Sequence, residues 1–306
     1  MLEQLAPGVY AYLHSRSGWG YSNAGVIAAS DTAMLVDTQY TLPMTRRLIA
    51  AIGDADLPPI STVVNTHPNG DHCWGNQLVT QAETIASAAT AHSMPHDFPP
   101  ELMSRLLSDE AQATAAGRYT RQHFGQFDFT GIKVAPPMRT FSGCLEVPLG
   151  NRTIVLIEVG PAHTEGDAIV YVPDSAVVFA GDILFTADHA VMWTGPLANW
   201  IAACDTILAT GATRIVPGHG PIVSRAGVIE FRSYLEHVQA GLELRYRQGM
   251  PYWQAAMDIP LGQYKELPLR ERLVATAAAT YHHLGAPKAA PAEVLERMAQ
   301  AYFDAT

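Results

Sequence analysis

The chain has 306 residues, 48% of them hydrophobic, and its 19 basic and 29 acidic residues give a formal net charge of −10. This length and composition allow a large buried core, as one big domain or two tightly joined halves, and argue against disorder. The negative charge disfavours non-specific attraction to nucleic acid or to anionic membranes, so we expect no nucleic acid and no membrane among the partners.

Cysteine content and the N-terminal residues bear on the cellular compartment. The three cysteines, Cys73, Cys144 and Cys204, are an odd number without CxxC spacing, which argues against a disulfide scaffold and against a structural zinc knuckle. Residues 1–7 lack the basic start and apolar core of a signal peptide. No apolar run approaches the roughly 18 residues of a membrane span. We therefore expect a cytoplasmic protein.

The N-terminal part of the chain reads as strands followed by a helix and a further strand. Short β-like runs at 8–12, 23–28 and 33–37 are separated by Gly, Ser and Asp, which predicts an antiparallel meander. A helical stretch at about 42–53 precedes an apolar strand at 60–64.

The rest of the chain alternates between helical and strand-like segments. Residues 99–127 are helical and mixed, and they could form a lid over a site or a surface helix pair that packs on the sheet. Strands are predicted at 153–157, 168–172 and 176–180. After Pro221 the chain is largely helical to its end.

The segment Asn65–His72 carries the most specific chemical signal. It follows the apolar strand at 60–64 and contains His67, Asp71 and His72 within six residues. A strand end is rigid, and a short loop can turn these three side chains toward one point, which is the arrangement that a divalent cation needs from imidazole and carboxylate ligands.

Three more candidate ligands follow apolar strands later in the chain. His163 lies in the segment 160–167, Asp182 follows the strand at 176–180, and His219 lies in the segment 216–221. Each sits among small residues, and glycine there permits close packing around an ion. Four ordered motifs after four strands are very unlikely by chance.

These motifs resemble those of the metallo-β-lactamase-fold superfamily. The spacing of His67, Asp71 and His72 is similar to the His-x-His-x-Asp-His signature of that family, and the resemblance spans roughly residues 8 to 224. It implies an α/β fold, a four-layer αβ/βα sandwich with the metal at the edge where the two sheets meet. We accordingly expect a core at residues 1–224 and a helical C-terminal segment at 225–306 that packs on it.

The resemblance also implies two metal sites that share one carboxylate. The first site would take His67, position 69 and His163, and the second would take the Asp71, His72 and His219 side chains, with Asp182 bridging the two. Asp37, which closes the strand at 33–37, would support the metal loop.

One position departs from the family signature, because Asn69 stands where the second histidine is expected. An amide oxygen is a much poorer zinc ligand than a neutral imidazole. We therefore expect Zn²⁺ to bind tightly at the site of Asp71, His72, Asp182 and His219, with a second ion weak or absent, and iron or manganese as possible replacements.

The role of Asn69 itself stays open at this point. One interpretation is simple divergence, with the amide pointing at a water molecule. The other is catalytic, with the amide donating a hydrogen bond to a substrate carbonyl or a developing oxyanion. Asp71 would be a ligand and would also orient the attacking water.

Aromatic residues near the motifs indicate the substrate pocket. Trp74 follows the metal loop, and His189 and Trp193 lie in a segment that resembles the loop crossing the active-site mouth in related sequences. An aromatic-rich mouth favours a bulky hydrophobic or aromatic substrate. The alternative, that Trp193 and Trp200 are core anchors, stays open.

The best-supported function is a metal-dependent hydrolase of an ester, thioester or lactone bond in a bulky, aromatic or polyketide-like small molecule. The runs 65–76 and 160–164 look similar to the thioesterase/cyclase branch that serves bacterial aromatic polyketide pathways. The alternatives are a non-hydrolytic cyclase or lyase that uses the metal as a Lewis acid, and a non-catalytic binding protein. The carboxylate-rich cluster argues against the last, since it needs a cation to offset its charge.

An acyl carrier protein is a possible partner but is not favoured. Carrier proteins are acidic, so docking would need a local basic face on this acidic chain. We interpret the candidate residues as ordinary solvated charges; they are Arg105, Arg118, Arg121, Lys133 and Arg139.

Overall fold

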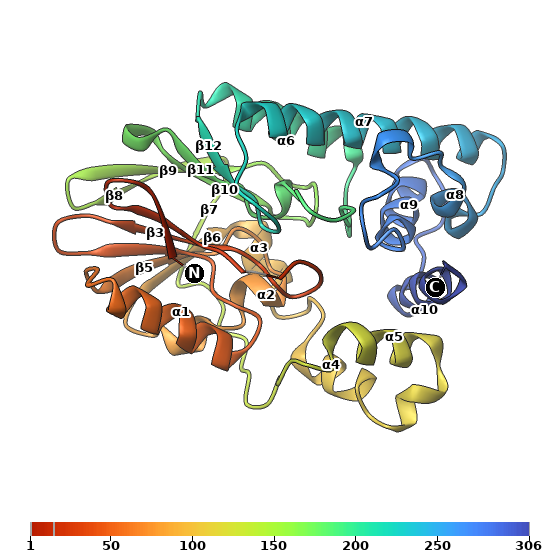
Figure 1. The fold of residues 1–306 in the computed structure, drawn as a ribbon, viewed down its shortest axis with the longest axis horizontal. Coiled ribbons are helices and arrows are strands. Elements are labelled where there is room, and N and C mark those ends of the chain that lie inside the picture. Colours follow the sequence, from red (N-terminus) through yellow and green to blue (C-terminus); the bar gives the residue numbers. More distant parts are fainter. Residues whose placement is uncertain (1, 15, 306) are drawn as a thin grey trace.

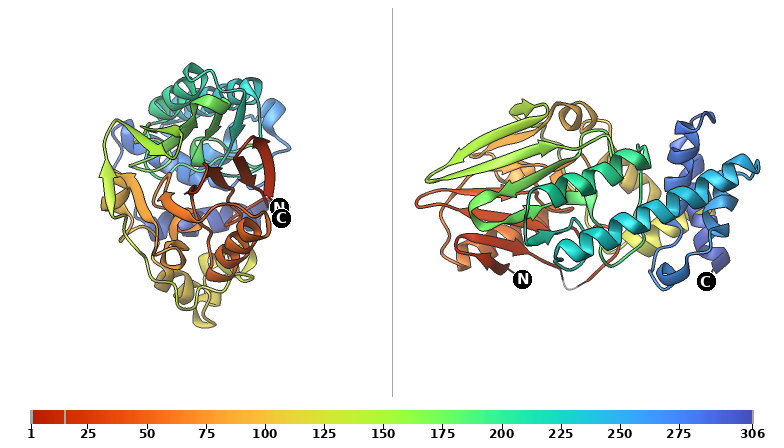
Figure 2. Two further views of the ribbon diagram at one scale, coloured as in Figure 1. Left: turned by 90° about the vertical axis from the view of Figure 1, so that its left-hand side faces the viewer. Right: turned by 90° about the horizontal axis from the view of Figure 1, so that it is seen from above.

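Two β-sheets stack face to face, and helices cover both outer surfaces, in a computed structural model that describes residues 2–14 and 16–305 (Figure 1). One sheet has seven strands in the order β1-β2-β3-β4-β5-β6-β7, and the other has five in the order β12-β11-β10-β9-β8. The end-on view shows the stacking of the sheets (Figure 2). The predicted four-layer sandwich is thereby confirmed.

The strands of the first sheet are β1 (Leu2–Ala6), β2 (Val9–Tyr12), β3 (Ala24–Ala28), β4 (Ala33–Val36), β5 (Ile60–Val64), β6 (Glu83–Ser87) and β7 (Arg139–Phe141). Strands β1 to β4 pair antiparallel, which confirms the predicted meander. Strands β4 to β7 pair in parallel, so their carboxyl ends lie at one edge of the sheet.

The strands of the second sheet are β8 (Cys144–Leu149), β9 (Arg152–Glu158), β10 (Ala168–Val172), β11 (Val177–Phe179) and β12 (Arg214–Val216). Strands β8 to β11 pair antiparallel and β11 pairs in parallel with β12. The three strands that the sequence predicts in this region are present as β9, β10 and β11.

The alternation of side chains along β4 explains the layers. Met34 and Val36 face the second sheet and pack in the core between the two sheets. Ala33 and Leu35 face the other way and pack with Leu48 of α1 (Leu42–Asp54). Because successive strand residues point to opposite faces, a continuous apolar strand requires a packing partner on both sides.

The remaining helices are α2 (Gly70–Cys73), α3 (Ala88–Ser93), α4 (Pro100–Leu106), α5 (Ala115–Phe124), α6 (Leu197–Ala209), α7 (Arg225–Arg247), α8 (Tyr252–Asp258), α9 (Arg272–His283) and α10 (Pro291–Ala305). Helices α6 and α7 cover the second sheet, and α7 continues beyond it to the C-terminal helices (Figures 1 and 2). Helix α10 packs against α5, which joins the C-terminal region to residues 99–127. Among the described residues, no helix is long and apolar enough to cross a membrane.

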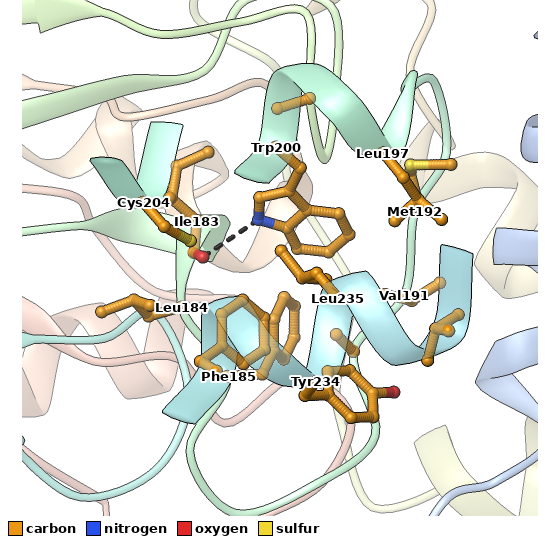
Figure 3. Packing of buried hydrophobic residues seen from close by; sticks show 14 of the residues in the cluster. Ile183, Leu184, Phe185, Val191, Met192, Leu197, Trp200, Cys204, Tyr234 and Leu235 are labelled. Carbon is orange, nitrogen blue, oxygen red and sulfur yellow. Dashed lines mark hydrogen bonds between the residues drawn. The ribbon is translucent and has the colours of Figure 1, made fainter. Parts of the chain in front are cut away.

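The helical C-terminal region shares one hydrophobic core with the second sheet. This core contains Ile169 of β10, Trp200 of α6, Leu235 of α7 and Leu273 of α9. Figure 3 shows the Trp200 indole between α6 and α7, with its Nε1 donating a hydrogen bond to the carbonyl of Ile183 at 3.0 Å. This side chain therefore ties the core to the loop that begins at Asp182.

We predict that Trp200→Ala lowers the free energy of unfolding by about 3–5 kcal/mol, because it removes a fully buried aromatic side chain and leaves a cavity. Urea unfolding followed by circular dichroism measures the change. The matched control is Ile229→Ala on α7, whose side chain is 50% exposed and whose loss should change stability by no more than about 0.5 kcal/mol. Equal effects of the two substitutions would contradict this assignment of the core.

Candidate metal centre

The candidate ligands come from strand ends that meet at one edge of the sandwich. His67 follows β5, and Asp71 and His72 lie in the short helix α2. His163 lies in the loop between β9 and β10. Asp182 and His219 follow the parallel strands β11 and β12. The structure thus brings all six residues together from four loops.

The Asp182 carboxylate lies at the centre of four imidazoles. Its Oδ2 is 3.3 Å from Nε2 of His163, 3.4 Å from Nε2 of His219 and 3.7 Å from Nε2 of His67. Its Oδ1 is 3.2 Å from Nε2 of His72. All five side chains are buried, so a single desolvated carboxylate faces four ring nitrogens.

Asp71 provides a second carboxylate at one side of this cluster. Its Oδ2 lies 3.4 Å from Nε2 of His219 and 3.8 Å from Nε2 of His72. Two triads result, in each of which the ligand atoms lie within 4.8 Å of one another: His67 with His163 and Asp182, and Asp71 with His72 and His219.

Hydrogen bonds at Nδ1 aim three of the rings. Nδ1 of His72 donates to Oδ2 of Asp37 at 2.8 Å, and Nδ1 of His163 donates to the carbonyl of Val191 at 2.7 Å. The Thr66 hydroxyl donates to Asp37, so its oxygen accepts from Nδ1 of His67 at 2.9 Å. With the proton on Nδ1, each neutral ring presents the Nε2 lone pair to the centre, as a metal ligand must.

Asp37 supports the ligand histidines from behind. It lies at the end of β4 in a left-handed backbone conformation, with a φ of 61°. Besides His72, its carboxylate accepts the backbone N–H and the hydroxyl of Thr66. The supporting contact that the resemblance implied for Asp37 is therefore present.

The polar atoms at the centre have the properties expected of a cation site. Nε2 of His67, Nε2 of His72 and Oδ1 of Asp182 are buried and have no hydrogen-bond partner. Burying polar atoms without partners is costly unless something else coordinates them. A divalent cation bound by two nitrogens and one oxygen in each triad fits this donor set.

Glycine makes room for the central carboxylate. A Cβ on Gly218 would collide with Oδ1 of Asp182, and a Cβ on Gly181 would lie 2.6 Å from Oγ1 of Thr66. Gly181 also has a φ of +51°, which L side chains rarely adopt. The glycines beside Asp182 and His219 are therefore a steric requirement of the cluster.

The charges of the cluster are mutually dependent. Burial opposes ionisation of Asp182, but the surrounding imidazoles hold its pKa well below the usual range. Burial lowers the pKa of His219, but the Asp182 and Asp71 carboxylates outweigh it and raise that pKa to about 9. At neutral pH His219 of the metal-free protein therefore carries a proton, which a bound cation must displace.

A family model of the metallo-β-lactamase superfamily matches residues 17–219, and this range includes every residue of the cluster. The chain belongs to the metallo-β-lactamase superfamily. Members of this superfamily are mostly metal-dependent hydrolases. Two curated proteins and one solved structure show what this chain is similar to.

Among curated relatives, the chain is 25% identical over 198 residues to the 2,4-dinitroanisole O-demethylase subunit alpha of Nocardioides sp. (strain JS1661), covering 62% of this chain and 50% of the relative. It is 22% identical to the linear primary-alkylsulfatase of Pseudomonas sp. (strain ATCC 19151), covering 67% and 42%. This chain therefore spans about half or less of the length of these two relatives. Its fold resembles that of the mono-zinc form of the metallo-β-lactamase FIM-1 from Pseudomonas aeruginosa, with 20% identity, a TM-score of 0.57 and coverage of 77% and 94%.

Asn69 stands at the one position that departs from the superfamily signature. It contacts both the cluster and the Asp97 carboxylate outside it. Its Nδ2 donates to Oδ2 of Asp97 at 2.7 Å, which turns Oδ1 toward Nε2 of His163, also at 2.7 Å. An amide oxygen and a neutral imidazole nitrogen are both acceptors, so a proton or a cation must lie between them. One amide hydrogen is thus committed to Asp97, and only the second remains for a hydrogen bond to substrate.

A cavity opens over the cluster and encloses about 820 Å³ between its walls and its open mouth. The metal side of its lining is Asn69, Asp71, His163, Asp182 and His219. The opposite walls are largely aromatic and apolar: Trp19, Tyr40, Trp74, Phe98, Met103, Leu106, Phe124, Trp193, Leu295 and Met298. The segment 99–127 therefore forms part of the cavity wall, as the lid interpretation requires.

The three residues expected at the pocket have different positions. Trp74 and Trp193 line the cavity. His189 does not: it is fully buried, and its Nδ1 hydrogen-bonds the Tyr234 hydroxyl of α7 at 2.9 Å. Sequence reasoning missed Trp19, Tyr40 and Arg272, which lie outside any motif and reach the cavity only through the fold.

We predict that Asp182→Ala removes bound metal from both triads, because this carboxylate lies beside all four imidazoles. Zinc affinity should fall by at least about a hundredfold, the upper end of what loss of an outer partner alone costs. Metal analysis of protein purified without added metal, followed by zinc titration, measures the loss. Asp205→Ala, at an exposed carboxylate of α6, is the control and should keep the wild-type metal content. Retention of metal in Asp182→Ala would refute the assignment of the cluster.

Replacing Asn69 by His should strengthen zinc binding at the triad of His67, His163 and Asp182, because an imidazole nitrogen replaces an amide oxygen. Competition titration of Asn69→His should show the second zinc equivalent bound about tenfold more tightly than in the wild type. Asn199→His, at an exposed position of α6 outside the cluster and the cavity lining, controls for adventitious binding by an added histidine. An unchanged second equivalent would show that position 69 does not limit this triad.

Proposed function

We propose that this protein is a metal-dependent hydrolase that cleaves an ester, thioester or lactone bond in a bulky aromatic or polyketide-like small molecule. The observation that carries the proposal is the cavity, in which the His/Asp cluster forms the floor and aromatic side chains form the walls.

The aromatic walls support a flat, apolar substrate. Trp193 lies 5.1 Å from Phe98 and 6.2 Å from Trp19 between ring centroids, and Trp19 lies 5.7 Å from Phe124. Aromatic rings bury large areas and stack on other rings, so they favour a planar ligand over a hydrated one. The O-demethylase and the alkylsulfatase named above have names that indicate substrates with aromatic or alkyl groups, which is compatible with this pocket.

We further propose that the ion is Zn²⁺, bound tightly by Asp71, His72, His219 and Asp182, and that Asn69 leaves the other triad weaker. When bound, such a cation lowers the pKa of water toward neutrality and stabilises negative charge on a carbonyl oxygen. Iron or manganese would suit the same nitrogen and oxygen donors.

The residues around the cluster would have separate roles. Asp37, Thr66 and the carbonyl of Val191 fix the imidazole rings. Asp71 lines the cavity, where its carboxylate would bind the ion and orient the attacking water. The oxygen of Asn69 faces Nε2 of His163, and its second amide hydrogen is available to a substrate oxygen.

The substrate need not be delivered by an acyl carrier protein. Arg121 already pairs with Asp109 at 2.8 Å, and Arg118 donates to the carbonyls of Gln112 and Ala113 and lies over the Phe303 ring. Internal partners leave these side chains less available to a carrier. A non-hydrolytic cyclase remains the second candidate, because an apolar cavity also suits a reaction that excludes water.

We predict that the zinc, iron or manganese form turns over free aromatic thioesters, esters or lactones. The double variant Arg118→Ala/Arg121→Ala should keep the wild-type rate within about twofold, since exposed charge pairs contribute little. The test is a panel of free acyl substrates and their carrier-bound forms, extended by an aryl ether and an alkyl sulfate. The Asp182→Ala variant is the inactive control. Turnover of carrier-bound substrate alone, with a large loss in the double variant, would assign these arginines to docking.

If no substrate reacts with any metal form, hydrolysis is refuted. Product analysis of a linear polyketide-like substrate then distinguishes the two remaining classes. Ring closure without uptake of ¹⁸O from labelled water would assign the protein as a cyclase, and binding without conversion would assign it as a binding protein.

A further inference from the structure

A buried arginine from the C-terminal region reaches the cavity. Arg272 is the first residue of α9, is 1% exposed and belongs to the cavity lining. It lies outside residues 17–219, which the superfamily model matches. Among the described residues that line the cavity, it is the only arginine or lysine.

The guanidinium of Arg272 is only partly satisfied by the protein. Nη1 donates to the carbonyl of His189 at 3.1 Å and lies 3.8 Å from Oδ2 of Asp188. Nε is buried without any partner, and no described residue accepts a hydrogen bond from Nη2. Oδ2 of Asp188 also accepts the backbone N–H of Gly18 at 3.0 Å, and its Oδ1 is buried without a hydrogen-bond partner. A buried cation with unused donors is costly unless a ligand supplies an acceptor.

Aromatic rings position this charge close to the metal cluster. The Cζ of Arg272 lies 4.1 Å from the centroid of the Trp19 ring and 5.7 Å from that of Phe185. The Phe185 ring stacks on His219, with centroids 5.2 Å apart and an interplanar angle of 8°. One aromatic ring therefore separates the guanidinium from a candidate metal ligand.

The histidines near Arg272 do not add positive charge to that of the arginines. Burial, with a contribution from nearby arginines, lowers the pKa of His189 to about 4, and burial together with Arg272 lowers that of His123 to about 4. Both are uncharged at neutral pH. Tyr119 donates its hydroxyl hydrogen to Glu271 at 2.8 Å and is neutral as well.

We propose that Arg272 forms a binding subsite for a carboxylate carried by the substrate, one aromatic ring away from the candidate metal ligand His219. The substrate class is then an aromatic acid derivative rather than a neutral aromatic ester, which extends and rests on the hydrolase function proposed above. Arginine suits this role because its planar, weakly hydrated guanidinium binds carboxylates while it stacks on an aromatic face.

A purely structural role for Arg272 predicts a different result. As a tie between α9 and the loop at Asp188, the residue would affect stability but would not discriminate between charged and neutral ligands. The decisive measurement is therefore the ratio of two dissociation constants, for 2-naphthoate and for the isosteric 2-naphthamide, determined by calorimetry. The zinc-loaded protein and the chelated protein are both titrated.

We predict that the wild type binds 2-naphthoate roughly ten- to a hundredfold more tightly than 2-naphthamide, the effect of one charge-assisted hydrogen bond. Arg272→Met should reduce this ratio to near one. Arg270→Met is the matched control, because Arg270 donates to the carbonyls of Met257 and Ile259 and does not line the cavity. This control should keep the wild-type ratio.

The double variant Arg272→Met/Asp188→Asn serves if Arg272→Met does not fold, since it leaves no orphaned carboxylate. A wild-type ratio near one, or a preference that survives removal of Arg272, would overturn the subsite. A preference that disappears on chelation would overturn it too, because the metal would then hold the carboxylate. These binding measurements need no turnover. If the protein hydrolyses no substrate but still prefers 2-naphthoate over 2-naphthamide through Arg272, the hydrolase proposal is refuted and the subsite is retained.

Discussion

The buried Asp182 carboxylate is the constraint on which the rest of the site depends. It lies within 3.7 Å of four imidazole nitrogens and is removed from water. Such a cluster is stable only if each ring is held in one orientation and the central charges are neutralised. Hydrogen bonds at Nδ1 hold the rings of His67, His72 and His163, and Phe185 stacks on His219. The cation expected in this superfamily meets the second requirement.

The sandwich explains why this cluster can exist at the protein's edge. Parallel pairing of β4 with β5, and of β11 with β12, places the loops that follow each pair at one edge of their own sheet. Each loop supplies short polar segments, while the strands behind it are apolar on both faces. The rigid core thus fixes the ligands, and the loops are free to vary in chemistry, as the position of Asn69 illustrates.

The helices after residue 224 turn an open metal edge into an enclosed pocket. Helix α9 contributes Arg272, α10 contributes Leu295 and Met298, and α5 faces them with Thr120 and Phe124. The Tyr119 hydroxyl accepts from Trp19 Nε1 and donates to Glu271, which links three distant parts of the chain at one wall. The cavity lining therefore combines residues within the superfamily core with residues beyond it, whereas the metal cluster lies wholly within the core.

The sequence by itself determined the elements and the metal motif, because both are local signals. Alternating and continuous apolar runs predict β4 and β9 to β11, and histidines and aspartates that follow strands among glycines predict the ligands. Trp74 and Trp193 were predicted at the pocket and line it, but only the tertiary structure decided the rest of its lining. His189 has a motif-like neighbourhood but hydrogen-bonds Tyr234 inside the core, whereas Trp19 and Arg272 have no local signal and meet because α9 packs against the N-terminal loop. Contacts between residues so far apart in the chain depend on packing, which no local pattern encodes.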